Sequence, residues 1–158
     1  ALSVLERAVA VERDVIEALR PSLLDTLGLV TALESLCEAF TRRTGLDVVP
    51  DLDPDLRALP PEASIALYRV VQEALANVRE HAQAKLVRVA LQRENEHLRL
   101  VIEDDGVGIP EDALADPRAH GLVGMRERLR LLGGTLLLRR GANGRGTVVD
   151  ATVPQPGP

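Results

Sequence analysis

The amino-acid sequence predicts a two-layer α/β (α+β) sandwich in which helices cover one face of a mixed, mostly antiparallel sheet. Two apolar runs that alternate with polar residues, 85–92 and 97–103, flank four polar residues and therefore predict a β-hairpin. Between Pro61 and His81 the apolar residues recur at helical spacing and form a single face, which predicts a helix packed on that sheet. A chain of 158 residues has room for one domain with one such core.

Composition excludes several classes of protein. A net charge of −5, with Tyr68 and Phe40 as the only aromatic residues, argues against nucleic-acid binding by phosphate contacts or by base stacking. Cys37 is the only cysteine, so one copy has no disulfide framework, and we expect a cytoplasmic location. The chain opens on Ala1 within a helical pattern, so we expect a piece of a longer protein that reaches a membrane only through missing upstream segments.

Two helices are predicted in the N-terminal third. The first spans residues 2–19 and ends at Pro21, and its apolar spacing suits packing on its own domain, on a second copy or on an absent helix. The second spans residues 29–43 and ends at Gly45. A short strand over residues 46–52 follows, and Pro50 within it indicates an edge of the sheet.

The third helix is expected to begin at Pro60 or Pro61 and to run to His81. Its apolar face is predicted to be core and carries Leu67, Tyr68, Val71, Leu75, Val78 and Ala82. Its polar face carries Glu73, Asn77 and His81 at successive helical turns, together with Arg69 and Glu80. This face is either a solvated surface or a row of chemically active groups.

The C-terminal part continues with a loop over residues 106–120, whose length favours a lid or binding role. A helix that starts near Met125 and ends at Gly133 follows. Residues 135–140 and 147–153 are predicted strands joined by a glycine-rich turn, and residues 155–158 form a tail.

The stretch VIEDDGVG, residues 101–108, has the layout of a ligand site, because an apolar strand ends on acids and then breaks at Gly106 and Gly108. The alternative is a surface turn with incidental acids. A P-loop motif is absent, and GVGIPE lacks the third glycine of a dinucleotide fingerprint.

A nucleotide site can be assembled from these groups. Asp104 could accept a hydrogen bond from the adenine amino group, and the side-chain oxygen of Asn77 could bind Mg²⁺. Phosphates could meet His81, Arg126, the lid amides or the backbone N–H groups that follow Gly121 at a helix N-terminus. Glu73 could orient or deprotonate a nucleophile.

Four segments in order carry a specific resemblance. EALANVREHA (73–82) resembles the N box, EDDGVGIP (103–110) the G1 box, HGLVGMRER (120–128) the G2 box and GRGT (144–147) the last glycine box of the GHKL ATPases. The chain therefore resembles the catalytic, ATP-binding domain of a bacterial two-component sensor histidine kinase, with the Bergerat ATPase fold. Within that group, residues 19–33 and 121–134 are similar to the nitrate-sensor and DesK-like subfamily.

The resemblance implies ATP and Mg²⁺ as ligands and gives roles to individual residues. It implies that Glu73, Asn77 and His81 are catalytic and that Asn77 and Glu73 lie at the metal. The implied cofactor-binding residues are Asn77, His81, Asp104, Gly106, Gly108, Ile109, Gly121, Leu122, Gly124, Met125 and Thr147.

The resemblance also implies an organisation and partners. Residues 1–28 would be the end of a dimerisation and phosphotransfer helix with a linker, and residues 29–154 the catalytic domain. The expected partners are the phosphoacceptor histidine helix of the same kinase, a second copy in a homodimer, and a response regulator of LuxR/NarL type. None of the three histidines lies in a phosphoacceptor motif, so that histidine is expected outside this piece. A GHKL ATPase that hydrolyses ATP with water and a non-catalytic dimerisation or signalling module are the alternatives.

Overall fold

The computed structural model describes residues 2–56, 59–109 and 121–155, and these contain a five-stranded sheet in the order β1-β2-β3-β5-β4. Strand β1 pairs parallel with β2, whereas every other neighbouring pair is antiparallel, so the predicted mixed and mostly antiparallel sheet is confirmed. The strands are β1 (Asp47–Leu52), β2 (Leu86–Glu94), β3 (His97–Asp104), β4 (Thr135–Arg140) and β5 (Thr147–Pro154). Pro50 lies on the edge strand β1, as predicted, where its missing N–H breaks no ladder inside the sheet.

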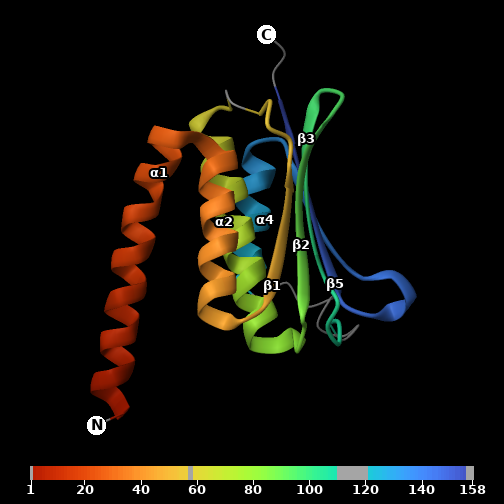
Figure 1. The fold of residues 1–158 in the computed structure, drawn as a ribbon. Helices are drawn as coiled ribbons and strands as arrows, with labels where there is room; N and C mark the ends of the chain where they lie inside the picture. Colours follow the sequence, from red (N-terminus) through yellow and green to blue (C-terminus); the bar gives the residue numbers. More distant parts are fainter. Residues whose placement is uncertain (1, 57–58, 110–120, 156–158) are drawn as a thin grey trace.

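Three helices cover one face of this sheet. Figure 1 shows the second half of α1 (Leu2–Thr44), α2 (Pro61–Asn77) and α4 (Leu122–Leu131) on the same side of the strands. The strands turn every second side chain toward these helices, and Val89 and Leu91 of β2 and Leu100 of β3 are fully buried there. The apolar face predicted for the third helix is buried as well, with Leu67 and Val71 at 0% exposure.

Helix α1 differs from the prediction. The prediction that a first helix ends before Pro21 is wrong, because the helical assignment continues from Leu2 to Thr44 and is interrupted only at Gly28, where φ is 85° and ψ is 171°. A proline removes one backbone hydrogen bond and can remain within a helix, whereas a residue in that glycine conformation cannot continue the helical path. Figure 1 shows α1 folding back on itself at this kink. The predicted helix over residues 29–43 is the second half of α1, which ends at Thr44 before Gly45.

The end of the third helix also differs. Helix α2 ends at Asn77 and continues as a π-helical turn, η1 (Val78–Ala82), followed by Gln83 with a left-handed φ of 51°. The wider turn changes the direction of the side chains after Asn77, and such turns occur often at functional sites. The predicted end at His81 is therefore correct to within one residue, but the predicted uniform helical spacing is not.

The predicted lid falls mostly on residues 110–120, which lie outside the described residues. The helix predicted to start near Met125 begins earlier, at Leu122, and the following turn contains the short η3 (Ala142–Gly144) before β5. Among the described residues, no helix is both long and apolar enough to cross a membrane.

The face of the sheet opposite the helices carries an ion-pair network centred on Asp150. Arg99 donates from Nε to Asp150 Oδ1 at 3.0 Å and from Nη2 to Oδ2 at 2.7 Å, and Arg139 lies 3.9 Å away. The side chain of Asp150 is only 10% exposed. Hydrogen bonds from Arg99 hold the pKa of Asp150 below its ordinary value.

Replacing Asp150 with asparagine is expected to lower the free energy of unfolding at pH 7 by about 1 kcal/mol, a modest value because Arg99 is partly solvated. Because the folded-state pKa is lowered, this stabilisation is present above the ordinary aspartate pKa and is lost as the pH falls through the folded-state value. Urea titrations from pH 7 down to pH 3 should show the wild-type and variant curves converging. A difference that stays constant with pH would contradict the ion-pair explanation.

Candidate functional site

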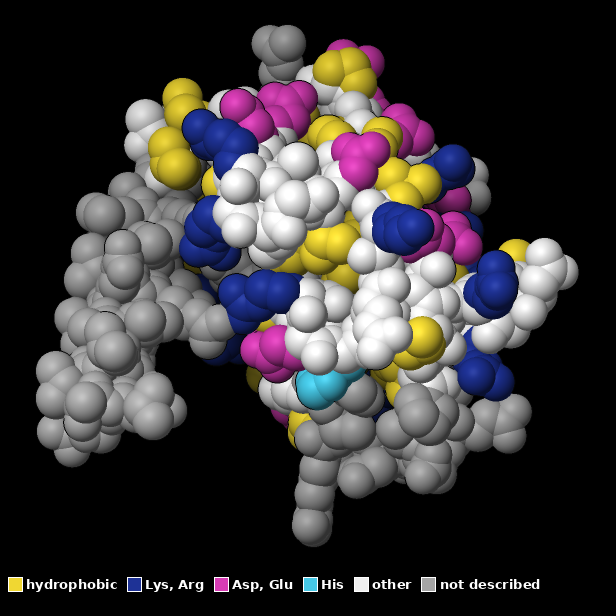
Figure 2. All heavy atoms as spheres, turned by 60° about the horizontal axis from the view of Figure 1, so that its bottom comes forward, with side chains coloured by type: hydrophobic (Ala, Val, Ile, Leu, Met, Phe, Trp, Pro, Cys, Tyr) yellow, Lys and Arg dark blue, Asp and Glu magenta, His cyan; other side chains and the backbone are white. Residues whose placement is uncertain are grey.

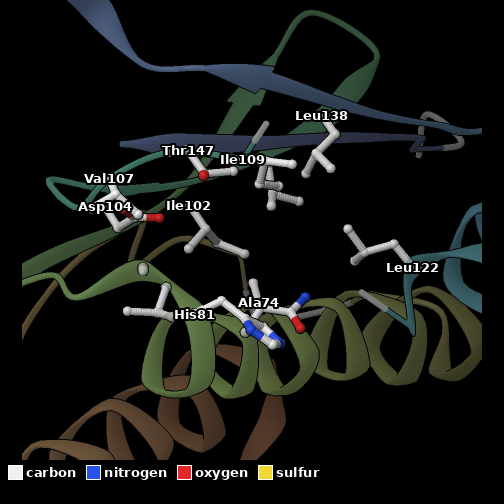
Figure 3. Close-up of a pocket in the computed structure, with 14 residues that line it drawn as sticks. Ala74, His81, Ile102, Asp104, Val107, Ile109, Leu122, Leu138 and Thr147 are labelled. Carbon is white, nitrogen blue, oxygen red and sulfur yellow. The ribbon is translucent and has the colours of Figure 1, made fainter. Parts of the chain in front are cut away.

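A cavity of about 380 Å³ lies between α2 with its π-helical turn, the strands β3, β5 and β4, and the start of α4. Figure 3 shows its lining side chains converging from the helix and from the sheet. The lining residues are Ala74, Asn77, Val78, His81, Ala82, Ile102, Asp104, Val107, Gly108, Ile109, Leu122, Leu138, Thr147 and Val149.

The sheet side of the cavity is apolar because of the strand register. Ile102 of β3 pairs with Val149 of β5, which pairs with Leu138 of β4, so three branched side chains form one row across the sheet. Side chains directly opposite one another in neighbouring strands lie on the same face. This row therefore gives a flat aliphatic wall suited to a planar apolar ligand group.

Asp104 brings a carboxylate to one end of that wall. It follows Ile102 by two residues, so the alternation of the strand turns both side chains toward the cavity. The residue is 6% exposed, and its Oδ1 accepts a hydrogen bond of 2.8 Å from the backbone N–H of Gly106. Burial raises the pKa of Asp104 above its ordinary value, while the backbone N–H groups of Gly106 and Thr147 oppose that rise.

The neighbouring Asp105 has a different role in the structure. Its Oδ1 accepts hydrogen bonds from the backbone N–H groups of Leu86 at 3.0 Å and Lys85 at 2.8 Å. These bonds, led by that from Leu86, hold the pKa of Asp105 below its ordinary value. Asp105 therefore fastens the end of β3 to the start of β2, and Asp104 is the carboxylate that faces the cavity.

Two glycine-containing loops close the cavity around Asp104. The N–H of Val107 donates to Ala82 O at 2.8 Å, and the N–H of Gly146 donates to Gly106 O at 2.8 Å. A Cβ on Gly106 would overlap Ala82 O, and one on Gly146 would overlap Asp104 O. At Gly106 and Gly146 the backbone therefore lies so close to a neighbouring segment that no Cβ atom fits between them.

The helix side of the cavity carries part of the predicted polar row. Asn77 and His81 line the cavity, whereas Glu73 is not among the lining residues. The carboxylate of Glu73 instead lies against Gly121, where a Cβ would overlap Oε1 and where φ is +65°. Glu73 therefore contacts the residue that precedes α4 and is placed beside the cavity.

The predicted site residues divide into two groups. Those that line the cavity are Asn77, His81, Asp104, Gly108, Ile109, Leu122 and Thr147. Those outside its lining are Glu73, Gly106, Gly121, Gly124 and Met125. Within the second group, Gly106 and Gly121 shape the loops that border the cavity, and Met125 packs partly buried against the core. A Cβ on Gly124 would meet nothing within 4 Å.

Sequence reasoning missed most of the apolar lining. The missed residues are Ala74, Ile102, Val107, Leu138 and Val149, whereas Val78 and Ala82 were predicted as core and also line the cavity. Period-two alternation offered a signal for two of them, since Ile102 precedes Asp104 by two residues and Val149 follows Thr147 by two. Leu138 had no such signal, because its place depends on the pairing of β4 with β5.

In the described part of the chain, no three His, Cys, Asp or Glu side chains gather as a metal cluster. The amide oxygen of Asn77 is a suitable hard ligand for Mg²⁺, but one such ligand needs further oxygens from the bound molecule. Leu122 lines the cavity as the first residue of α4, so the positive end of that helix lies at the same place.

Figure 2 brings the lower end of Figure 1 forward and shows apolar side chains among Lys, Arg, Asp and Glu side chains at this end of the molecule. An apolar slot that also holds a buried carboxylate, an amide and a helix N-terminus is typical of a nucleotide-binding class of protein.

The comparison with family models agrees with that class. The model of the histidine kinase-, DNA gyrase B- and HSP90-like ATPases matches residues 62–157, and the chain belongs to this family. Family membership implies ATP binding and confirms the resemblance inferred from the four boxes.

Named relatives are sensor kinases. The chain is 39% identical to the sensor histidine kinase MctS of Rhizobium johnstonii over 87% of this chain and 30% of that protein. It is 34% identical to the oxygen sensor histidine kinase NreB of Staphylococcus carnosus over 96% of this chain and 43% of that protein. It is 33% identical to the nitrate/nitrite sensor protein NarX of Escherichia coli K12 over 81% of this chain and 21% of that protein. The chain thus spans less than half the length of these relatives.

A solved structure shares the fold. The histidine kinase domain of the Erythrobacter litoralis EL346 blue-light activated histidine kinase has a TM-score of 0.66 and 28% identity, over 80% of this chain and 60% of that chain. The predicted fold class is confirmed by this likeness and by the five-stranded sheet.

Proposed function

We propose that this chain is the ATP-binding catalytic part of a sensor histidine kinase, which presents the γ-phosphate of Mg-ATP to a histidine on a separate helix. The observation that carries the proposal is the buried carboxylate of Asp104 in a mostly apolar cavity. An ionised carboxylate is an acceptor only, so a buried one selects a ligand that donates, as the adenine amino group does.

The polar groups on the helix side of the cavity suit the triphosphate. Asn77, His81 and Leu122, the first residue of α4, line the cavity, and they offer an amide oxygen, an imidazole and the N–H groups of a helix N-terminus. Mg²⁺, when bound, would neutralise charge on the phosphates, with the Asn77 oxygen as the protein ligand in this proposal. Gly121 and Gly124 would border the triphosphate, and Thr147 and Ile109 the base.

The position of Glu73 bears on the alternative of simple ATP hydrolysis. The Glu73 carboxylate contacts Gly121, which this proposal places beside the triphosphate, so Glu73 is placed to orient or deprotonate a nucleophile in either reaction. The likeness to named sensor histidine kinases favours a histidine over water as the acceptor. We therefore propose phosphoryl transfer to a histidine as the main reaction.

The proposed partners are those expected of a sensor histidine kinase. Residues 1–28 would belong to a dimerisation helix, the phosphoacceptor helix would come from the same kinase, and the response regulator would be of LuxR/NarL type. The resemblance to nitrate and oxygen sensors named above supports this regulator class. ATP as the phosphoryl donor would place the domain in the cytoplasm.

The direct test is calorimetric titration of the chain with a non-hydrolysable ATP analogue, with Mg²⁺ or with EDTA. Saturable binding that strengthens with Mg²⁺ is expected. A second assay supplies a two-helix hairpin bearing a phosphoacceptor histidine together with radiolabelled ATP. Label on the hairpin supports the kinase proposal, whereas phosphate release that ignores the hairpin would support the hydrolytic alternative.

Asn77→Ala is expected to reduce the Mg²⁺-dependent gain in ATP affinity by about tenfold, because a metal-ligand oxygen is removed. Affinity in EDTA should change far less. The matched control is Gln72→Ala, which removes an amide from the same helix outside the cavity lining, where Gln72 accepts a hydrogen bond from Arg69. Equal Mg²⁺ gains in wild type and Asn77→Ala would show that Asn77 is no metal ligand.

A further inference from the structure

Arg140, at the end of β4, lies beside the cavity without having been assigned a role. It follows Leu138, a cavity residue, by two positions, so the strand alternation places it on the helix-covered face of the sheet. Its register partner is Thr147, another cavity residue. A Cβ built on Gly108 would lie 3.6 Å from Arg140 Nε, so the guanidinium group is adjacent to the backbone of the glycine loop.

This place is at the base end of the cavity in the proposed function. Figure 3 shows Asp104, Val107 and Thr147 toward one end of the cavity and Leu122 toward the other, with Ile109 between them. Arg140 borders Gly108 and Thr147, which both line the cavity. Thr147 is one of the residues that the proposed function places at the base.

The composition of the cavity gives the guanidinium group a specific use. The chain has one Tyr and one Phe and no Trp, and both Tyr68 and Phe40 are buried in the core outside the cavity lining. A purine in this slot would thus meet aliphatic walls without a Phe, Tyr or Trp ring to stack on. A guanidinium group is planar, delocalised and weakly hydrated, and it stacks on aromatic faces where an ammonium group does not.

We propose that Arg140 is a base-contacting residue whose guanidinium plane packs on the purine of the bound nucleotide at the rim formed by Gly108 and Thr147. The inference rests on the proposed function, because it requires a nucleotide in the cavity. A Cβ on Gly108 would be in ordinary contact with Arg140 Nε, so the guanidinium lies close beside the loop backbone. Arg140 would add affinity and base preference without touching the reacting phosphate.

Arg139 provides a matched control of equal charge. It is the neighbouring residue on the same strand, but its guanidinium lies 3.9 Å from Asp150 on the opposite face of the sheet. Removing Arg139 changes the net charge as much as removing Arg140 does. A contact with the base is therefore distinguishable from a general electrostatic effect.

The experiment is NMR titration of the 15N-labelled chain with adenosine and, separately, with a Mg²⁺-bound non-hydrolysable ATP analogue. Arg140→Ala should weaken both ligands by a similar factor of about two to five, the range of an exposed cation–π contact. Arg140→Lys should recover little of the lost affinity, because lysine restores the positive charge but not the planar guanidinium group. Arg139→Ala should leave both affinities unchanged.

Three results would overturn the inference. These are unchanged affinities in Arg140→Ala, a loss confined to the ATP analogue, and an equal loss in Arg139→Ala. A loss confined to the ATP analogue would indicate that Arg140 contacts a phosphate. An equal loss in Arg139→Ala would indicate a general effect of positive charge. Failure of the proposed function has a different signature, because the folded wild type would then bind neither ligand. That result would overturn the inference as well.

Discussion

Asp104→Asn should lower the affinity for ATP by about tenfold to 100-fold, the loss expected when a charged hydrogen-bond acceptor is replaced in a buried site. The carboxylate is 6% exposed and faces the cavity, so water cannot readily replace the lost contact. Asparagine keeps the shape but removes the charge and presents an N–H₂ group that competes with the amino group of the base. Calorimetric titration with the non-hydrolysable analogue measures the change.

The control is Asp150→Asn, which makes the same chemical change at another buried carboxylate, on the face of the sheet opposite the cavity. Its ATP affinity should equal that of the wild type. Because burial raises the pKa of Asp104, acidification should weaken ATP binding at a higher pH than an exposed carboxylate would require. Undiminished affinity in Asp104→Asn would remove Asp104 from the base site.

Gly146→Ala is expected to lower the free energy of unfolding by about 2 to 5 kcal/mol and to weaken ATP binding with it. Gly146 has a φ of +69°, and a Cβ there would overlap the carbonyl oxygen of Asp104. The methyl group must therefore displace backbone at the end of β3, which also carries the cavity carboxylate. Urea denaturation followed by circular dichroism measures stability, since the chain has no tryptophan.

Gly144→Ala separates the two causes of that loss. Gly144 has a φ of +70°, but a Cβ there would meet nothing within 4 Å. It should cost about 1–2 kcal/mol, which is the left-handed backbone penalty alone. If Gly146→Ala is no worse than Gly144→Ala, the close packing of the two glycine loops does not contribute to stability.

Local patterns determined much of the architecture. Period-two alternation marked the β2–β3 hairpin, period 3.6 marked the buried face of α2, and Pro50 marked an edge strand, because each of these signals arises from a few neighbouring residues. Pro21 was misleading for the same reason. A local rule places a helix end at proline, whereas the backbone leaves the helical path at Gly28.

The chemistry of the site was also readable in the sequence. A strand ending in two acids followed by spaced glycines indicated a ligand site, and the four ordered boxes indicated the ATPase family to which the chain belongs. Composition alone showed that few aromatic rings could stack on a base. Sequence alternation does not state which strand neighbours which, so the aliphatic wall of Ile102, Val149 and Leu138 stayed hidden.

By itself the sequence determined the types of element, the family and the chemical groups available, because these depend on residue identity and on short-range spacing. Only the tertiary structure decided which groups meet. It turned Asp104 into the cavity and fastened Asp105 to β2, set Glu73 against Gly121, and brought Arg140 beside Gly108. The physical reason is that these contacts join segments distant along the chain, and their geometry follows from strand order, register and the π-helical turn after Asn77.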